Sequence, residues 1–181
     1  MKKIIILTVV YVLLVSYGET GKNQRLQIEN EAEEEIYNHY IDSFLNTGAT
    51  PYSDIYGGNP SCSEYGCSEI KVITSPDFDV LVTIKKENKV VRHAYIRAND
   101  SYIFEIPNGV YQPFFYYGRG WYPEKIMKET PEGIIKGGFV SDETFGKDDP
   151  QVLEDEILEY QLIFQTNGNF GALPSNAEDA L

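Results

Sequence analysis

Cysteine and histidine are scarce in this chain, which has 181 residues and only two of each. Cys62 and Cys67 lie within S-C-S-E-Y-G-C, and neither His39 nor His93 stands at a spacing that would complete a zinc site. The cysteine spacing also differs from the C-x-x-C of redox motifs. The sequence therefore predicts no zinc centre.

Long hydrophobic runs are also lacking, apart from a short one at the start. After two lysines, an apolar run extends from Ile4 to Val15, and small residues follow at Ser16 and Gly18. A bilayer-spanning helix needs about 20 apolar residues, so this run is too short. The layout predicts an export signal over residues 1–18, with an uncleaved anchor as the alternative. We expect the protein in the periplasm, at the cell surface or secreted.

Basic residues are few, since 15 Lys and Arg accompany 28 Asp and Glu and give a formal net charge of −13. Such a field repels phosphate backbones and anionic lipids, so neither nucleic acid nor a membrane surface is an expected partner. Gly118-x-Gly120 lacks the third glycine and the following helix of a phosphate loop. No cofactor is predicted, and solubility accounts for the charge.

The two cysteines acquire a simple interpretation once export is assumed. In an oxidising compartment, Cys62 and Cys67 are expected to form one structural disulfide across a tight loop. Glycine and proline punctuate residues 47–66, so little regular structure would otherwise fix this part of the backbone. A reactive thiol pair is the alternative.

Residues 19–46 are expected to form a polar linker followed by an amphipathic helix. Apolar residues recur at every fourth position from Ile28 to Phe44, and glutamates crowd the beginning, where the helix dipole favours negative charge. Asn46-Thr47-Gly48 is a stop signal. The apolar stripe is expected to pack on its own domain, and a stalk or a partner helix is the alternative.

The centre of the chain has the alternation of apolar and polar residues that is typical of strands. The expected strands cover residues 68–74, 79–86, 89–97, 101–107, 110–117, 133–140 and 156–165. Residues 118–123 are expected to form a turn, and residues 142–150 an acidic loop. The pattern predicts a mainly β protein: an antiparallel β-sandwich over residues 47–170, with a flexible tail over 171–181.

Two turns set the expected pairing. Glu87-Asn88 suits a two-residue turn that places Val82 opposite His93 on an apolar face. A histidine there is expected to be a hydrogen-bonded core residue. Asn108-Gly109 is the strongest short hairpin signal, and it would pair Ile106 with Tyr111. Pro113 cannot donate to a ladder, so its strand is expected at an edge or at a bulge.

Two resemblances support this fold. Residues 79–118, with V-T-I-K-K-E-N-K-V-V and S-Y-I-F-E-I-P-N-G-V-Y, resemble the transthyretin-like β-sandwich of carboxypeptidase-regulatory-type domains. Residues 47–170, with C-S-E-Y-G-C-S-E-I, V-V-R-H-A-Y-I-R and F-F-Y-Y-G-R-G-W, are similar to uncharacterised exported proteins of Bacteroides-like bacteria. The first resemblance implies an accessory or binding module without catalytic residues. The zinc-peptidase domain that often accompanies such modules is missing, and the N-terminal helix is not part of the family pattern.

The best candidate ligand site is the aromatic group around the expected 118–123 turn. It consists of Tyr116, Arg119, Trp121 and Tyr122. Aromatic faces stack on sugars or on peptide side chains, and arginine adds hydrogen-bond donors. Alternatively, Trp121 closes one end of the core. Asp142, Glu143, Asp148 and Asp149 are a weak calcium candidate, because their spacing departs from that of the calcium-hand loop, and a solvated acidic loop is the preferred interpretation.

The sequence thus favours an exported, non-catalytic binding or structural module that contacts a glycan or a peptide through the aromatic end. A protein that interacts or oligomerises through its N-terminal helix is the alternative. A hydrolase that uses a pair of carboxylates is a third interpretation, but nothing in the sequence selects one pair among 28 acidic residues.

Overall fold

The computed structural model describes residues 25–63, 66–163 and 173–181. The expected export signal, residues 1–18, lies outside these ranges, as do parts of the expected linker, last strand and tail. The chain divides into two units, residues 1–39 and 40–181, and each is described by itself. Residues 25–40 are helical, and residues 41–45 of the expected helix are not.

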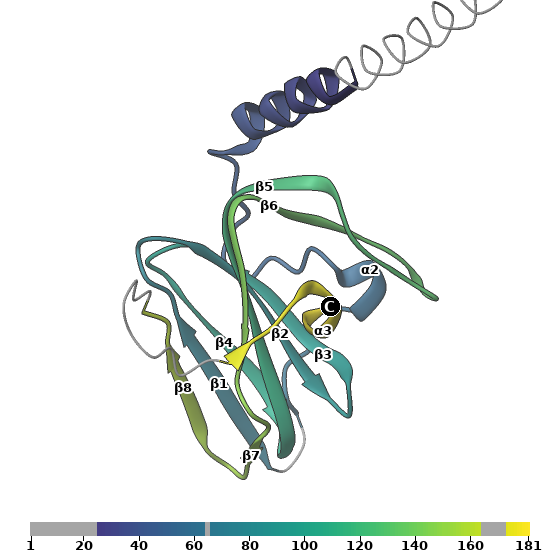
Figure 1. Cartoon of the computed structure of the whole chain (residues 1–181). Coiled ribbons are helices and arrows are strands. Elements are labelled where there is room, and N and C mark those ends of the chain that lie inside the picture. The colour runs from purple at the N-terminus through teal and green to yellow at the C-terminus, as the bar shows by residue number, and fades with distance from the viewer. Residues whose placement is uncertain (1–24, 64–65, 164–172) are drawn as a thin grey trace, which may run out of the picture. The chain divides into compact units, whose positions relative to one another are not determined.

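Nine strands and two short helices make up the described part of the second unit (Figure 1). They are β1 (Cys67–Ile73), β2 (Asp79–Lys86), β3 (Lys89–Ile96), β4 (Ser101–Pro107), β5 (Gly109–Thr130), β6 (Gly133–Lys147), β7 (Gln151–Leu153), β8 (Ile157–Gln161), β9 (Leu173–Pro174), α2 (Ser53–Tyr56) and α3 (Ala177–Ala180). The expected bounds of β2 and β4 agree with the structure, because β4 alternates apolar with polar residues, while β2 is a short run of mainly apolar residues that a turn ends.

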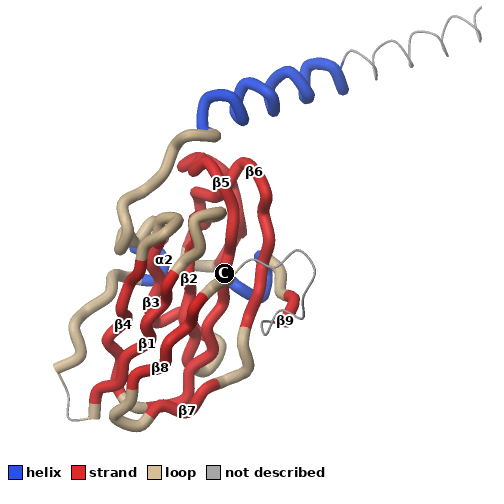
Figure 2. The backbone as a smooth tube through the Cα atoms, turned by 90° about the vertical axis from the view of Figure 1, so that its left-hand side faces the viewer, coloured by secondary structure: helices blue, strands red, loops and turns tan. Residues whose placement is uncertain are grey.

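The strands form two sheets (Figure 2). The small sheet has the order β4-β1-β8, and the large sheet has the order β3-β2-β5-β6-β9, with β7 also paired to β5. The expectation of an antiparallel fold is wrong for one pair of strands, because β8 runs parallel to β1. Both sheets contribute to one apolar cluster, in which Ile70, Phe104 and Phe115 are at most 1% exposed. The fold is therefore mainly β, with two sheets that share a core.

A second apolar cluster covers the other face of the large sheet. Its sheet residues include Leu81 and Tyr95, and Tyr52 and Leu181 contribute to it from outside the strands. The large sheet is therefore covered on both faces, which explains the near-continuous burial along β2.

The free edge of β3 is closed by the chain segment that precedes β1. Main-chain atoms of Gly48 and Ala49 exchange hydrogen bonds of 2.8 Å with Tyr95. The amide side chain of Asn59 bonds the backbone N–H and C=O of His93 at 3.1 and 2.8 Å. Unpaired strand edges invite association, so these bonds protect the sheet.

The β2–β3 hairpin turns at Glu87 and Asn88, which both have positive φ, and this expectation is confirmed. The register differs by one residue, since His93 lies opposite Thr83 instead of Val82. The cause is a bulge between Ile84 and Lys85, which adds one residue to one strand. His93 is consequently on the face of the second cluster.

The expected hairpin at Asn108-Gly109 is wrong, because β4 pairs with β1 and β5 pairs with β2. Asn108 is instead where the chain crosses from the small sheet to the large one. Ile106 and Tyr111 are both buried in the shared core but belong to different sheets. Pro113 lies between the part of β5 that pairs with β6 and the part that pairs with β7, so its missing N–H interrupts neither ladder.

The expected turn at 118–123 and most of the acidic loop are strand. β5 and β6 form one long bent ribbon whose register shifts near Arg119 and Tyr122 (Figure 1). Bulges bend strands, and Gly120, with φ 69°, allows the backbone of Tyr40 to approach where a side chain would collide. The tail also differs from expectation, since Ala180 and Leu181 are buried.

Candidate functional site

The expected disulfide between Cys62 and Cys67 is present, and it joins the segment before β1 to the first residue of that strand. Within the described ranges no cysteine is free. A disulfide is typical of proteins in oxidising compartments. With both thiols in this bond, the aromatic and charged side chains remain as candidates for binding.

Two residues of the predicted aromatic site are buried in the second cluster. Trp121 and Tyr116 are 4% and 2% exposed. The Trp121 ring lies edge-on to the rings of Tyr95 and Phe139, with 5.4 Å between centroids in each case. Such edge contacts stabilise a core. Trp121 thus closes the core, as the alternative interpretation expected, and offers no surface on which a ligand could stack.

The other two residues of that site reach solvent. The Arg119 guanidinium lies 5.2 Å from the ring centroid of Phe78, and its Nε donates to the carbonyl of Asp77 at 3.1 Å. The half-buried ring of Tyr122 lies 4.7 Å from the ring of Tyr40. What remains accessible at this end is one guanidinium and one tyrosine edge.

Tyr116 belongs to a polar network beneath the ribbon. Its hydroxyl donates to Glu143 and accepts the N–H of Phe139 at 2.9 Å, while Lys125 Nζ lies 2.5 Å from Glu143. Burial, and then the hydrogen bond to Glu143, raise the pKa of Tyr116 far above its usual value. The hydroxyl is therefore protonated and serves the packing of the ribbon.

The four residues of the calcium candidate do not meet. Asp142 is 3.7 Å from Arg119, and Glu143 binds Lys125. The Asp148 carboxylate accepts the Tyr160 hydroxyl at 2.7 Å. Across the part of the chain that the structure describes, no group of three or more Asp, Glu, His or Cys side chains could hold a metal ion.

His93 is a buried, hydrogen-bonded residue, as expected. It is 1% exposed, and its Nε2 accepts the backbone N–H of Tyr52 at 3.0 Å. Burial lowers the pKa of His93 from 6.5 to about 4, and a backbone hydrogen bond to Thr50 opposes this only in part. The imidazole is neutral at pH 7 and unavailable to a ligand.

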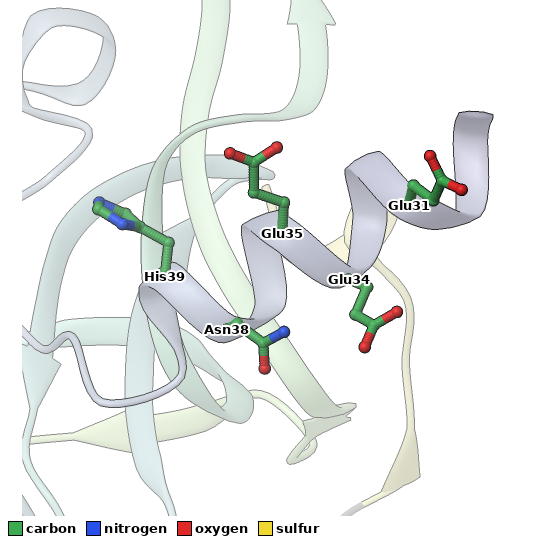
Figure 3. Close-up of a pocket in the computed structure, with 5 residues that line it drawn as sticks. All are labelled: Glu31, Glu34, Glu35, Asn38 and His39. Carbon is green, nitrogen blue, oxygen red and sulfur yellow. The ribbon is translucent and has the colours of Figure 1, made fainter.

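The N-terminal helix carries an open pocket whose lining side chains diverge (Figure 3). It is lined by Glu31, Glu34, Glu35, Asn38 and His39. Glu34 and Asn38 point to one side of the helix, and Glu35 and His39 point to the other. Divergent carboxylates cannot enclose a cation, so this is a solvated helix surface.

A cationic groove that the sequence analysis missed lies beside the β2–β3 turn. Lys86 and Lys89 are directly opposite each other in the register of the hairpin. Like charges at paired positions are destabilising. Among the described residues, no carboxylate oxygen lies within 4 Å of either amine, in contrast to Lys71 and Lys136. The sequence signal was K-K-E-N-K over residues 85–89.

The groove next to this pair has a volume of about 380 Å³. It is lined by Lys85, Lys86, Glu87, Asn88, Val110, Tyr111, Gln112 and Pro150. The Lys86 amine lies 5.4 Å from the ring centroid of Tyr111. Val110 and its partner Val152 are 50% and 61% exposed at one side. The groove therefore combines ammonium groups, amides and exposed apolar surface.

No protein-family model, curated protein or solved structure is detectably similar to this chain. Within the described ranges, every helix is too short or too polar to cross a bilayer.

Proposed function

We propose that this protein is an exported, non-catalytic binding module of the cell envelope or its surroundings, and that its ligand is an acidic glycan or peptide. The fold we propose is a β-sandwich of the transthyretin-like kind, antiparallel except where β8 runs parallel to β1, behind a signal at residues 1–18 and an amphipathic helix. The Cys62–Cys67 disulfide and the two sheets with a shared core support this proposal.

The observation that carries the proposal is the unneutralised Lys86–Lys89 pair beside the groove. In a chain with net charge −13, cations that face each other without carboxylates within 4 Å cost stability. An anionic ligand would remove that cost, and the exposed Val110 and Val152 would contact its apolar part. Gln112 and Asn88 supply amide groups that can orient hydroxyl or carbonyl groups.

The test is a titration of the protein with polygalacturonate and with poly-glutamate, followed by calorimetry at low and high salt. We expect one of them to bind, and binding to weaken with salt. The Lys86→Gln/Lys89→Gln variant should raise Kd at least tenfold. Lys136→Gln is the matched control, because Lys136 lies on the ribbon and pairs with Glu124 at 2.9 Å.

An Arg119→Gln variant in the same titration examines the aromatic end. If Arg119→Gln weakens binding and Lys86→Gln/Lys89→Gln does not, the ligand binds at the aromatic end and not at the groove. Failure of every acidic glycan and peptide to bind the folded protein would contradict the proposed function.

Self-association through the N-terminal helix is a second candidate, favoured by the 65% exposure of Ile28 and by the exposed Ala32, which lies one turn further along the same helix face. Apolar side chains along one helix face are typical of partner helices. Light scattering on the protein and on a variant lacking residues 19–45 decides this. An unchanged number of subunits after deletion would exclude it.

A further inference from the structure

The last residues of the chain lie on the large sheet as a bound peptide would. β9 adds to the edge of β6, where Leu173 and Pro174 face Lys147 and Gly146 (Figure 2). α3 follows, capped by Asn176, whose Oδ1 accepts the N–H of Asp179 at 2.8 Å. Strand addition at a sheet edge is a common mode of peptide recognition.

Three lysines of the sheet contact α3, and we call this surface the lysine seat: Lys85, Lys128 and Lys147. Lys85 Nζ donates to the carbonyl of Asp179. Lys128 Nζ donates to the carbonyls of Glu178 and Leu181 at 2.8 and 3.1 Å. Lys147 Nζ is 3.2 Å from the Asp179 carboxylate. Ammonium groups at the end of a helix also complement its dipole.

Apolar contacts complete the attachment. Ala180 and Leu181 are 1% and 5% exposed and belong to the second cluster, together with Phe114. The amines of Lys85 and Lys147 lie 5.0 and 5.8 Å from the centroid of the Phe114 ring. The Thr83 hydroxyl donates to the carbonyl of Ala180 at 2.7 Å. The end of α3 thus combines buried apolar side chains with satisfied carbonyls.

The segment both covers the lysines and compensates their charge. With α3 in place, the Lys128 side chain is 18% exposed. Burial, and then the nearby Lys128, lower the pKa of Lys85, while the carboxylates of Asp179 and Glu178 oppose this. A segment that covers these ammonium groups must therefore supply anionic or carbonyl oxygens in place of the water it removes.

We propose that the lysine seat is a binding site for an acidic peptide segment, which the chain fills with residues 176–181 and which a similar segment of another polypeptide can fill in trans. Four of the polar contacts go to main-chain oxygens, so any peptide with the same backbone path makes them. Selectivity comes from the carboxylates at 178 and 179 and from the small and large apolar side chains at 180 and 181. This site shares Lys85 with the lining of the groove at Lys86 and Lys89, but its occupant lies against Lys128, Lys147 and Phe114, so the proposal does not depend on a ligand in the groove.

The test uses the full chain with the double substitution Ala180→Asp/Leu181→Asp, which should release the segment without shortening the protein. The probe is a fluorescein-labelled peptide of residues 173–181, LPSNAEDAL, with an amidated end. Fluorescence anisotropy should show saturable binding to the double variant, at least tenfold tighter than to the wild-type chain, whose own segment competes.

Two controls locate the binding. Adding Lys128→Gln to the double variant should weaken the peptide at least tenfold, whereas adding Lys136→Gln should leave it unchanged. A peptide with aspartate at the positions of Ala180 and Leu181 should not bind. Equal affinity for the wild type and the double variant, or no binding to a double variant with a wild-type circular dichroism spectrum, would overturn the proposal.

A milder substitution tests the same proposal in case the double variant does not fold. Leu181→Ala removes apolar contact without adding a charge, so the fold should survive it. The labelled peptide should then bind at least threefold tighter to Leu181→Ala than to the wild type. Unchanged affinity in this folded variant would equally overturn the proposal.

Discussion

The backbone N–H of Tyr52 donates a hydrogen bond of 3.0 Å to Nε2 of His93, and this bond joins the loop around α2 to the face of the large sheet. Because Nε2 is an acceptor, the neutral imidazole must carry its proton on Nδ1. Protonation of Nε2 would break the bond within a site that is 1% exposed. The contact therefore couples loop attachment to pH.

Acid should weaken the fold through His93. Its folded-state pKa of about 4 lies below the unfolded value of 6.5, so its stabilising effect is complete above pH 6.5 and is lost as the pH falls toward 4. We predict that the difference in unfolding free energy between wild type and His93→Gln shrinks by about 2–3 kcal/mol from pH 7 to pH 4.5. Urea unfolding at both pH values measures it.

A difference between wild type and His93→Gln that stays constant with pH would show that His93 does not titrate as described.

Removal of the disulfide should lower stability moderately. Cys62 and Cys67 are five positions apart, and closing so small a loop corresponds to about 2 kcal/mol in the chain-entropy model. We expect the Cys62→Ser/Cys67→Ser variant to lose about that free energy of unfolding. Reductant should destabilise the wild type by a similar amount and leave the double variant unaffected. Equal stability of wild type and variant would contradict the prediction.

The ribbon over the second cluster depends on a glycine. Gly137 has φ 105°, and a Cβ there would lie 2.6 Å from the Trp121 ring. Gly137→Ala should therefore cost about 2–4 kcal/mol, because backbone strain and overpacking add. Trp121 fluorescence in a denaturant titration follows the loss. Gly58→Ala is the matched control, since nothing lies within 4 Å of the position that its Cβ would occupy. If both substitutions lowered the free energy of unfolding equally, the close approach of Gly137 to the Trp121 ring would not explain the effect.

Local patterns predicted the strands well and the topology poorly. The apolar run of β2, the alternation along β4 and the positive φ at Glu87 and Asn88 follow from side-chain burial and turn chemistry, which a sequence displays directly. The length of β5 was hidden, because Gly120 and Pro123 are typical of turns. In the folded chain, these residues instead lie where the ribbon bends.

Local patterns were also insufficient to predict the candidate site. The sequence located the aromatic residues around Trp121 but could not tell whether they face solvent or the second cluster, since aromatic side chains serve both environments. The opposition of Lys86 and Lys89 depends on register, and the docking of Leu181 depends on a partner surface over 30 residues away in sequence. Neither leaves a local signal.

A substitution at Asn108 can distinguish the two interpretations of Asn108-Gly109, a hairpin turn or a crossing between the two sheets. In a hairpin turn, glycine would replace asparagine at little cost. In the structure, Asn108 Oδ1 accepts from the Ser68 hydroxyl at 2.7 Å and from the N–H of Asp155 at 2.9 Å, while its Nδ2 donates to the Asp155 carboxylate at 2.8 Å. These bonds tie the crossing between the sheets to both β1 and the turn before β8.

Asn108→Gly should therefore cost about 2–4 kcal/mol, since it leaves the buried Ser68 hydroxyl without this bond and adds backbone freedom. Asn88→Gly is the matched variant at the true hairpin turn, where positive φ favours glycine, and it should change stability by about 0.5 kcal/mol or less. Chemical denaturation of both variants gives the comparison. If Asn108→Gly were as mild as Asn88→Gly, Asn108 would be an ordinary turn residue, and the hydrogen bonds at the crossing would contribute nothing to the attachment of one sheet to the other.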